Sequence, residues 1–257
     1  MGIDACVIGY GVVGQATAAV FGIDKYFDLN GSTITLERAA KTKYIFLCLP
    51  TPVKDGRYNI EATREIVKQI AGYGCGGILI NRSTVTPGTA RALSDEFQVS
   101  IVANPEFLDQ QTAEHDAKHP SFIILGGDLK NYTAAVRGLY DSRFKGIDVI
   151  ETDTVTAEMV KVSMNAFFGT KVVFANELYD VCKKNGADYG KVKEALEKHR
   201  YGSKNHFGIF HKGGRGAGGR CLSKDLEAFT DYSKSDLLQV VQRINKELLE
   251  EYPKTEI

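Results

Sequence analysis

The sequence has no net charge, because its 32 lysine and arginine residues are balanced by 32 aspartate and glutamate residues. The basic residues are also scattered along the chain and form no run. Binding to nucleic acid relies on a basic patch that neutralises phosphate groups. The composition therefore argues against nucleic acid as a partner.

Long apolar runs are missing as well. No stretch approaches the roughly 20 residues that a helix needs to cross a bilayer. The N-terminus leads into a strand-like run at Asp4 without a signal-peptide pattern. We therefore expect no membrane span and a cytoplasmic protein. With 257 residues, of which 43% are apolar, the chain can still build one large domain or two smaller ones.

The chain also lacks paired cysteines. A disulfide framework needs an even set of cysteines, and a zinc site usually shows C-x-x-C spacing. Here the cysteines are five in number and widely spaced: Cys6, Cys48, Cys75, Cys182 and Cys221. We expect reduced thiols and no metal site.

Residues 1–150 show short apolar runs that alternate with segments of helical periodicity. The runs are DACVIG, YIFLCLP, GILINRS, VSIVANP and SFIILGG. Strands that are buried on both faces read as continuous apolar runs of this kind. The pattern predicts an α/β domain with a doubly wound, Rossmann-type parallel sheet and helices on both of its faces.

Residues 151–257 have a different, helical pattern. The segment TVTAEMVKVSMNAFFGTKVVFANELYDVCKK continues for about 30 residues without proline, which is longer than a Rossmann crossover helix. Further helices are predicted over 188–199, 223–232 and 235–251, and a loop with seven glycines over 202–219. The long helix has more apolar surface than a small domain can cover, which predicts an all-helical region that forms a homodimer through it.

A G-x-G-x-x-G motif joins the first strand to the first helix, and it consists of Gly9, Tyr10, Gly11, Val12, Val13 and Gly14. In a dinucleotide site, Gly9 would make the tight turn, Gly11 would let the backbone approach a pyrophosphate, and Gly14 would pack helix on strand. The phosphates would then contact N–H groups at the N-terminus of the helix. The alternative is a tight βα turn that binds nothing.

An acidic residue at the end of the second strand would bind the adenosine ribose, and Asp28 in KYFDL is the candidate, with Asp24 as the alternative. Asp28 follows Gly14 by 14 residues, which is short and predicts a clipped first helix or loop. Asp28 can also be interpreted as an exposed turn residue. An acid at this position favours NAD over NADP.

Cys221 is the candidate nucleophile. It follows two glycines and precedes a predicted helix in GGRCLSKD. A helix N-terminus with Arg220 and Lys224 nearby is expected to lower the pKa of the thiol and favour the thiolate. Asp225 comes four residues later and therefore lies on the same face of the helix. We expect it to position a water molecule or a cationic partner beside the thiolate.

Lys161 and Asn165 interrupt the apolar surface of the long helix at a spacing of four residues. A lysine and an amide on one helical face suit the stabilisation of an alkoxide and the alignment of water. The alternative is a solvated polar face.

Two strand ends carry further polar candidates at the edge where open α/β sheets bind ligands. These are Ser83 and Thr84 in NRSTVTPGT and the segment Asn104–Leu108 in NPEFL. Glu106 in that segment can act as a general base through water. Either group can instead be a helix cap, a role for which Thr86, before Pro87, competes.

These motifs, in this order, resemble the UDP-glucose/GDP-mannose dehydrogenase family. The resemblance extends from GYGVVG through CLPTP, STVTPGT, NPEFL, EMVKVSMNAFFGTKVVFANEL and GAGGRCLSKD to LLQVVQRIN, which is nearly the whole chain. The family oxidises the C6 alcohol of a nucleotide sugar to a carboxylate with two NAD. The resemblance therefore implies an NAD-dependent enzyme of the UDP-glucose 6-dehydrogenase type with a nucleotide-sugar substrate.

The resemblance also assigns roles to single residues. Cys221 would attack the aldehyde intermediate to give a thiohemiacetal, and its oxidation would give a thioester that water releases. Lys161 would stabilise the oxyanion, and Asn165 and Asp225 would orient water or the sugar. Thr84 and Glu106 would activate water. Cofactor contacts would come from Thr51, Ser83, Thr84 and Lys224, and substrate contacts from Glu106, Phe107, Leu108, Lys161, Asn165, Gly218 and, across a dimer interface, Arg200.

The sequence also departs from the family pattern. The family continues into a second Rossmann-like domain that binds the nucleotide, whereas this chain stops at Ile257, so we expect that domain to be missing or supplied by a partner chain. Around the sugar site the departures are Ala217, Arg220, Leu222–Ser223 and Gln110–Gln111. They predict an altered substrate or a reduced activity.

Two other functions stay open at this point. One is a non-catalytic NAD-binding or oligomerisation module derived from the family. The other is a dehydrogenase of the β-hydroxyacid or 6-phosphogluconate type, which also uses a lysine and an asparagine four residues apart on a long helix. That type needs no cysteine nucleophile, so the reactivity of Cys221 distinguishes the two enzyme classes.

Overall fold

The computed structural model describes residues 3–202, 205–211, 214–219 and 221–252. Contacts divide the chain into two compact units. The first unit comprises residues 1–52 and 58–161, and the second comprises residues 53–57 and 162–257. The second unit thus includes a short segment from the N-terminal half of the chain.

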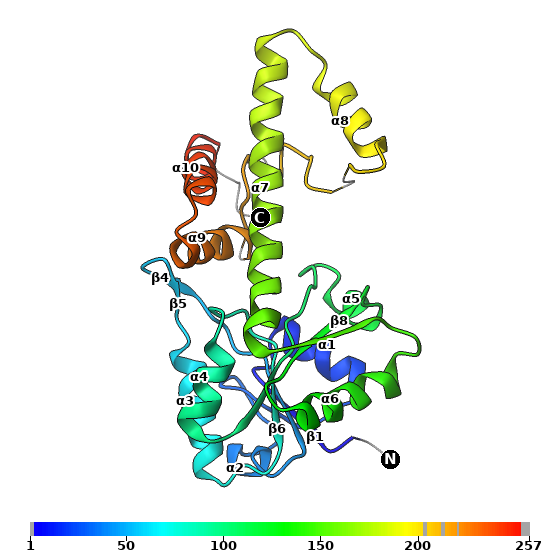
Figure 1. Ribbon diagram of the computed structural model, residues 1–257, viewed down its shortest axis with the longest axis vertical. Helices are drawn as coiled ribbons and strands as arrows, with labels where there is room; N and C mark the ends of the chain where they lie inside the picture. The colour runs from blue at the N-terminus through cyan, green and yellow to red at the C-terminus, as the bar shows by residue number, and fades with distance from the viewer. Residues whose placement is uncertain (1–2, 203–204, 212–213, 220, 253–257) are drawn as a thin grey trace. The chain divides into compact units, whose positions relative to one another are not determined.

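The first unit is built on a seven-stranded sheet with the strand order β2-β1-β3-β6-β7-β8-β9 (Figure 1). The strands are β1 (Ala5–Ile8), β2 (Tyr26–Phe27), β3 (Tyr44–Leu47), β6 (Ile78–Asn81), β7 (Ser100–Ala103), β8 (Ile123–Gly126) and β9 (Val149–Thr152). The five apolar runs correspond to β1, β3, β6, β7 and β8, which confirms the predicted doubly wound sheet.

The direction of one strand pair differs from the prediction. β7 and β8 are antiparallel, whereas the other neighbouring pairs of this sheet are parallel. The prediction of an entirely parallel sheet is therefore wrong at this pair. An apolar run that is buried on both faces looks the same in either direction, so the sequence pattern carries no information on strand direction.

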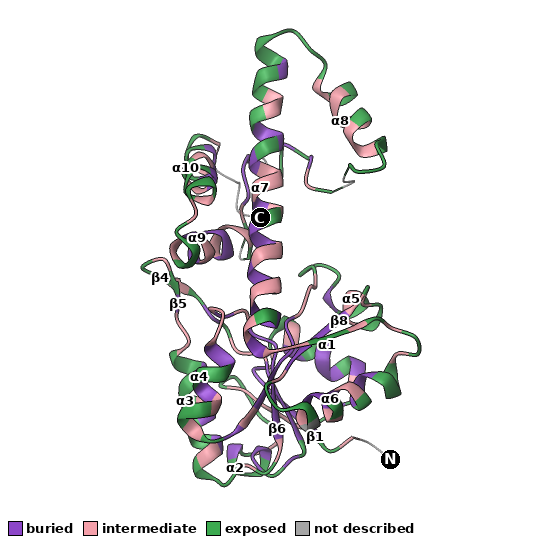
Figure 2. Cartoon of the chain, viewed as in Figure 1, coloured by how far each residue is buried: buried purple, intermediate pink, exposed green. Residues whose placement is uncertain are grey.

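Helices cover both faces of this sheet (Figure 1). One face packs against α1 (Val12–Phe21) and α6 (Lys130–Arg143), and the other against α2 (Leu36–Ala39), α3 (Glu61–Gly72) and α4 (Thr89–Phe97). Successive side chains of a strand point to opposite faces. The inner strands therefore divide their apolar side chains between two cores and are largely buried (Figure 2), whereas the edge strands β2 and β9 are only partly buried. The short α5 (Ala113–Lys118) completes the unit.

The second unit is helical. It contains most of the long helix α7 (Thr154–Lys184), together with α8 (Tyr189–Lys198), α9 (Leu222–Ser233) and α10 (Asp236–Glu251). All four match the predicted helices. Side chains of α7, α9 and α10 form its core, among them Val173, Leu226 and Val241. Most of the small hairpin β4 (Val53–Lys54) and β5 (Arg57–Tyr58) belongs to this unit, and it was not predicted.

The starts of α8 and α10 were predictable because each helix has a side-chain N-cap. The side chain of Asp188 accepts a hydrogen bond from the N–H of Lys191 and caps α8, and Ser235 caps α10 through the N–H of Leu238. Aspartate and serine are favoured N-caps because they satisfy amide groups that have no partner within the helix. In the part of the chain that the structure describes, none of the helices is both long and apolar enough to cross a membrane.

Candidate active site

The glycine motif forms the turn between β1 and α1, and each glycine has its own geometry. Gly9 has φ +88°, and a Cβ there would lie 2.5 Å from the carbonyl oxygen of Cys48. A Cβ at Gly14 would lie 2.0 Å from the carbonyl oxygen of Gly9. Gly11 is the N-cap of α1, and a Cβ there would meet no atom within 4 Å. The packing of the chain thus requires Gly9 and Gly14, whereas the space outside Gly11 is open.

This turn fits a dinucleotide. The first N–H groups of α1 have no partner within the helix, and a helix N-terminus attracts phosphate. The absence of a side chain at Gly11 leaves the backbone accessible to a pyrophosphate. Residues Gly9–Gly14 are thus the residues that would hold the phosphates of NAD.

Asp28 lies directly after β2, next to this turn. Its Oδ2 accepts a hydrogen bond from the N–H of Tyr10 at 2.7 Å, and its Oδ1 accepts one from the N–H of Asn30 at 2.9 Å. The hydrogen bonds from the backbone of Asn30 and Tyr10 lower the pKa of the Asp28 carboxyl. Asp24 precedes β2 and so lies at the opposite end of that strand. Since ligands bind at the carboxyl ends of such strands, the geometry favours Asp28 over Asp24.

The polar residues after β3 and β6 are bonded to each other's segments. Thr51 donates its hydroxyl hydrogen to the carbonyl of Thr84 at 2.6 Å, and Ser83 donates to the carbonyl of Leu49 at 2.8 Å. Thr51 and Ser83 are buried. These bonds hold three of the predicted cofactor-side residues together at the carboxyl edge of the sheet.

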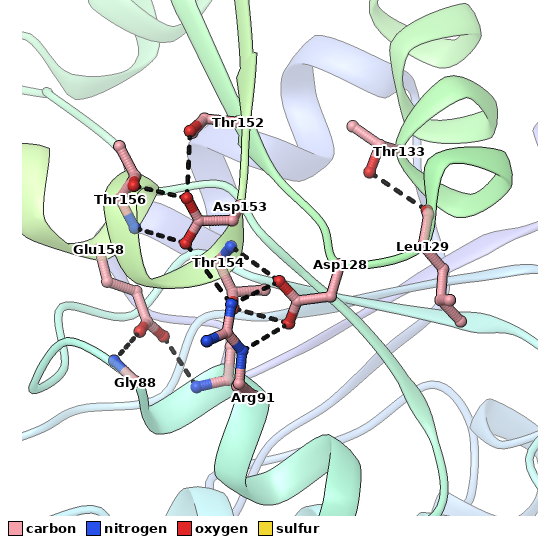
Figure 3. A network of polar contacts seen from close by, with 11 residues as sticks. Gly88, Arg91, Asp128, Leu129, Thr133, Thr152, Asp153, Thr154, Thr156 and Glu158 are labelled. Carbon is pink, nitrogen blue, oxygen red and sulfur yellow. Dashed lines mark hydrogen bonds and ion pairs between the residues drawn. The ribbon is translucent and has the colours of Figure 1, made fainter.

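None of Ser83, Thr84 and Thr86 is the N-cap of α4, so the alternative of a helix cap is wrong for these residues. The N-cap is Gly88, which has no side chain. The buried carboxylate of Glu158 on α7 takes this role and accepts hydrogen bonds from the N–H groups of Gly88 at 2.6 Å and Ala90 at 2.8 Å (Figure 3). Burial raises the pKa of Glu158 to about 7, although these N–H groups favour the charged form.

A second group of contacts fixes the start of α7 (Figure 3). Arg91 of α4 pairs with Asp128 at 2.8 Å, and Asp128 accepts a hydrogen bond from the hydroxyl of Thr154 at 3.0 Å. Asp153 accepts one from the N–H of Thr156 at 3.1 Å. The first turn of α7 is thus anchored to the first unit by several side chains.

One turn further along α7, Lys161 meets Glu106. The Lys161 ammonium lies 3.2 Å from Oε1 of Glu106, and the two side chains are only 8% and 13% exposed. Oε2 of Glu106 accepts a hydrogen bond from the N–H of Leu108 at 2.7 Å, and the ring of Phe107 lies 5.3 Å from the ammonium nitrogen. The NPEFL segment and α7 thus bring together four predicted residues. Lys161 and Asn165 are both buried, so the alternative of a solvated polar face is wrong.

Asn104 fixes the segment that carries Glu106 through three buried hydrogen bonds. Its side-chain oxygen accepts hydrogen bonds from Arg82 at 2.7 Å and from the hydroxyl of Tyr140, and its amide donates to the carbonyl of Ile124 at 2.9 Å. All three side chains are buried. Burial raises the pKa of Tyr140. This network fixes the backbone two residues before Glu106.

The second unit holds the other predicted catalytic residues. Asn165 donates its amide to Oδ2 of Asp225 at 2.5 Å, and the ammonium of Lys224 lies 2.6 Å from Oδ1 of the same carboxylate. Asp225 is 1% exposed, and Lys224 is its ion-pair partner within the unit. Its N–H donates to the carbonyl of Cys221 at 2.9 Å, which confirms the predicted spacing of Cys221 and Asp225 on one turn.

Cys221 is the N-cap of α9 and is exposed. Arg220, which was expected to act on the thiol, lies outside the described residues. Gly218 is half-buried in the loop before Cys221. Arg200 follows α8 and is exposed, and its guanidinium donates to the hydroxyl of Tyr201.

Two domain models of one known family match successive parts of the chain. The NAD binding domain of the UDP-glucose/GDP-mannose dehydrogenase family matches residues 24–144, and the central domain of that family matches residues 155–247. The chain belongs to the UDP-glucose/GDP-mannose dehydrogenase family. The resemblance seen in the sequence is thereby confirmed, and the NAD binding domain of the family confirms NAD as the cofactor.

Relatives within the UDP-glucose/GDP-mannose dehydrogenase family are longer. The chain is 31% identical over 233 residues to a UDP-glucose 6-dehydrogenase of Bacillus subtilis, covering 84% of this chain and 51% of the relative. It is 29% identical over 248 residues to a UDP-glucose 6-dehydrogenase of Rickettsia bellii, and this match covers 88% of this chain and 56% of the relative. The chain thus spans about half the length of these curated relatives. A solved UDP-glucose dehydrogenase from Pyrobaculum islandicum superposes with a TM-score of 0.85 at 25% identity, over 98% of this chain and 71% of that one.

The sequence pattern did not predict the buried polar residues that fix the backbone around the candidate site. Glu158, Arg82, Tyr140, Arg215 and Asn245 are charged or polar, yet all are buried. A signal existed for Glu158, which lies three residues before Lys161 and therefore on the same face of α7. For the others the partner is far along the chain, and no local pattern indicates it.

Proposed function

We propose that this chain oxidises the C6 alcohol of a nucleotide sugar, of the UDP-glucose type, to the carboxylate through a covalent adduct on Cys221. The observation that carries the proposal is an exposed cysteine at the N-cap of α9, one helical turn before a buried, paired carboxylate, Asp225. A helix N-terminus favours a thiolate, which is the reactive form of cysteine. In a family with an NAD binding domain, such a thiolate suits the oxidation of an aldehyde.

Residues Gly9–Gly14 would hold NAD, which when bound would supply the hydride acceptor for each oxidation at C6. Removal of the hydroxyl proton from C6 requires a base, and we assign this role to Glu106, acting through a water molecule. The ammonium of Lys161, 3.2 Å from Glu106, stabilises the negative charge that develops on the oxygen. Because both side chains are almost completely buried, their electrostatic effect is stronger than in water.

Cys221 acts in the second oxidation. Its thiolate adds to the aldehyde carbon, a C–S bond forms, and the carbonyl oxygen becomes an alkoxide. Loss of hydride from the same carbon gives a thioester. Water then attacks the thioester, the C–S bond breaks, and the carboxylate leaves with the thiol restored. Asn165 and Asp225, hydrogen-bonded to each other at 2.5 Å, orient the water or the sugar.

We also propose a homodimer through α7. Phe167, Phe174 and Val181 recur every seven residues on this helix and are 58%, 54% and 56% exposed. Residues at this spacing lie on one face, and an apolar stripe on an exposed helix is typical of a helix–helix interface. Sedimentation of the wild type should give a dimer, and Phe174→Glu should give a monomer. A monomeric wild type contradicts the interface.

The test of the catalytic role compares the wild type with Cys221→Ser, with Cys182→Ser as the matched control because that cysteine is buried in α7. The wild type and the control should release the sugar acid from a UDP-sugar, whereas Cys221→Ser should form none. Acid formation by Cys221→Ser at the rate of the wild type contradicts the covalent route through Cys221. A protein that binds NAD but oxidises no nucleotide sugar contradicts the proposed reaction and supports the alternative of a non-catalytic module.

A further inference from the structure

The loop before Cys221 has little structure of its own. Residues 214–219 include four glycines and form neither helix nor strand. Glycine loses more conformational freedom on folding than any other residue, so such a segment needs outside contacts to hold one conformation. Two buried side chains of the second unit, Arg215 and Asn245, supply these contacts.

Arg215 ties the loop to α7. Its Nε donates to the side chain of Asn176 at 2.9 Å, and its Nη2 donates to the backbone carbonyl of the same residue at 3.0 Å. Both terminal nitrogens also donate to Asp180, at 3.1 and 2.7 Å. The rings of Tyr179 and Tyr252 lie 5.3 and 4.8 Å from the guanidinium carbon. This two-pronged pairing fixes the direction of the guanidinium as well as its position.

Asn245 ties the same loop to α10. Its oxygen accepts a hydrogen bond from the N–H of Ala217 at 2.7 Å, and its amide donates to the carbonyl of Ala217 at 3.0 Å. Gly216 has φ +79°, and a Cβ there would lie 3.0 Å from the oxygen of Asn245 and 3.2 Å from Cβ of Leu248. The side chain of Asn245 thus bonds both the N–H and the carbonyl of one loop residue, as a neighbouring strand would do in a sheet.

A role in stability alone does not explain this choice of residues. Burying a guanidinium removes it from water, and an ion pair in the interior often contributes no more than an apolar pair of similar volume. Buried polar groups do select one conformation among several, because alternatives leave them without partners. Only residue 220 separates this loop from Cys221, the N-cap of α9, so the conformation of the loop affects how the chain enters the helix. The α9 turn itself is held by Asp225 and Asn165.

We propose that Arg215 and Asn245 are positioning residues that hold the loop so that the Cys221 thiol stays at the N-terminus of α9. The proposal rests on the proposed function only in taking Cys221 as the nucleophile. It assigns neither residue a contact with the substrate. The stabilisation of a thiolate by a helix N-terminus falls off within the first turn, so a small displacement of the thiol changes its reactivity.

The test measures carbamidomethylation of Cys221 by iodoacetamide as a function of pH, with mass spectrometry to separate the cysteines. Cys75, a half-buried thiol in the first unit, is the internal reference. We compare Arg215→Gln and Asn245→Ala with Arg243→Gln. Arg243 also lies on α10, but it is exposed and pairs with Glu247 at 2.8 Å.

We expect the rate at Cys221, relative to Cys75, to fall about two- to fivefold in Arg215→Gln and Asn245→Ala and to stay unchanged in Arg243→Gln. A residue that only stabilises the fold lowers the unfolding temperature but leaves this ratio in the folded protein unchanged. An unchanged ratio in both loop variants therefore overturns the proposal.

Asp180→Asn keeps the inference testable if Arg215→Gln does not fold. Asp180 is 48% exposed, and this variant removes its charge while the hydrogen bonds from Arg215 to Asn176 stay in place. We expect a smaller fall of the Cys221 ratio than in Arg215→Gln, and no fall contradicts the role of Arg215. Because alkylation needs no substrate, the outcome does not depend on whether the wild type oxidises a nucleotide sugar, which is measured separately.

Discussion

Replacing Glu158 by glutamine should change how stability depends on pH. Two effects compete at this side chain. Burial favours the neutral acid, whereas the N–H groups of Gly88 and Ala90, at 2.6 and 2.8 Å, favour the carboxylate. Burial is the larger effect, and it raises the pKa of Glu158 from 4.5 to about 7.

The sign and the size follow from this pKa. At a pH below 4.5 the side chain is protonated in both the folded and the unfolded chain, and its full contribution to stability is present. As the pH rises from 4.5 to about 7, the unfolded chain loses the proton while the folded chain keeps it, so stability falls. One pKa unit equals about 1.4 kcal/mol, so the total loss is about 3 kcal/mol. Glutamine does not titrate and lacks this loss.

The assay is urea unfolding of the wild type and Glu158→Gln, followed by circular dichroism, at several values between about pH 5 and about pH 8. The difference between the two unfolding free energies cancels the titration of all other groups. We expect the advantage of the wild type over the variant to shrink steadily as the pH rises. A difference that is independent of pH, or one that grows with pH, refutes the dominance of burial over the hydrogen bonds from α4.

Three further substitutions test the site. Gly14→Ala places a methyl group 2.0 Å from the Gly9 carbonyl oxygen and should destabilise the protein by about 1–3 kcal/mol in thermal unfolding. Gly11→Val meets open space, so it should cost about 1 kcal/mol or less and yet weaken NAD binding more than tenfold in calorimetry; unchanged affinity contradicts the proposed loop. Glu106→Gln leaves the buried Lys161 without its charged partner and should lower stability by about 3 kcal/mol and kcat by about 100-fold, whereas normal turnover rules out Glu106 as the base.

Much of the fold was predictable because the signals are local. The apolar runs identify five strands, the proline-free segment identifies α7 over its full length, and Asp188 and Ser235 mark helix starts. The glycine motif was predictable for the same reason, since Gly9 and Gly14 meet steric demands within a few residues or at the adjacent strand, and Gly11 leaves the backbone open to a ligand. The direction of β8 was not predictable, because burial of a strand is independent of its direction.

The candidate site likewise contains residues that local motifs predict and contacts that they do not. Lys161, Glu106 and Asp225 were identified from their positions in motifs, but the pairing of Lys161 with Glu106 depends on contacts between distant segments. Glu158 and Asn245 act on backbone groups 70 and 28 residues away, and a single sequence gives no indication of such partners. Their roles follow from tertiary packing, which overrides local propensity at these buried polar positions.

The central claim is the oxidation of a nucleotide sugar at C6, and the most direct measurement is the amount of NADH formed per molecule of sugar. The purified chain is given NAD and, in turn, a limiting amount of a UDP-sugar or a GDP-sugar, and the absorbance of NADH is read at completion. The account predicts two NADH per molecule of one of these sugars, together with the sugar acid as the product. One NADH per sugar, or none from a protein that demonstrably binds NAD, contradicts it.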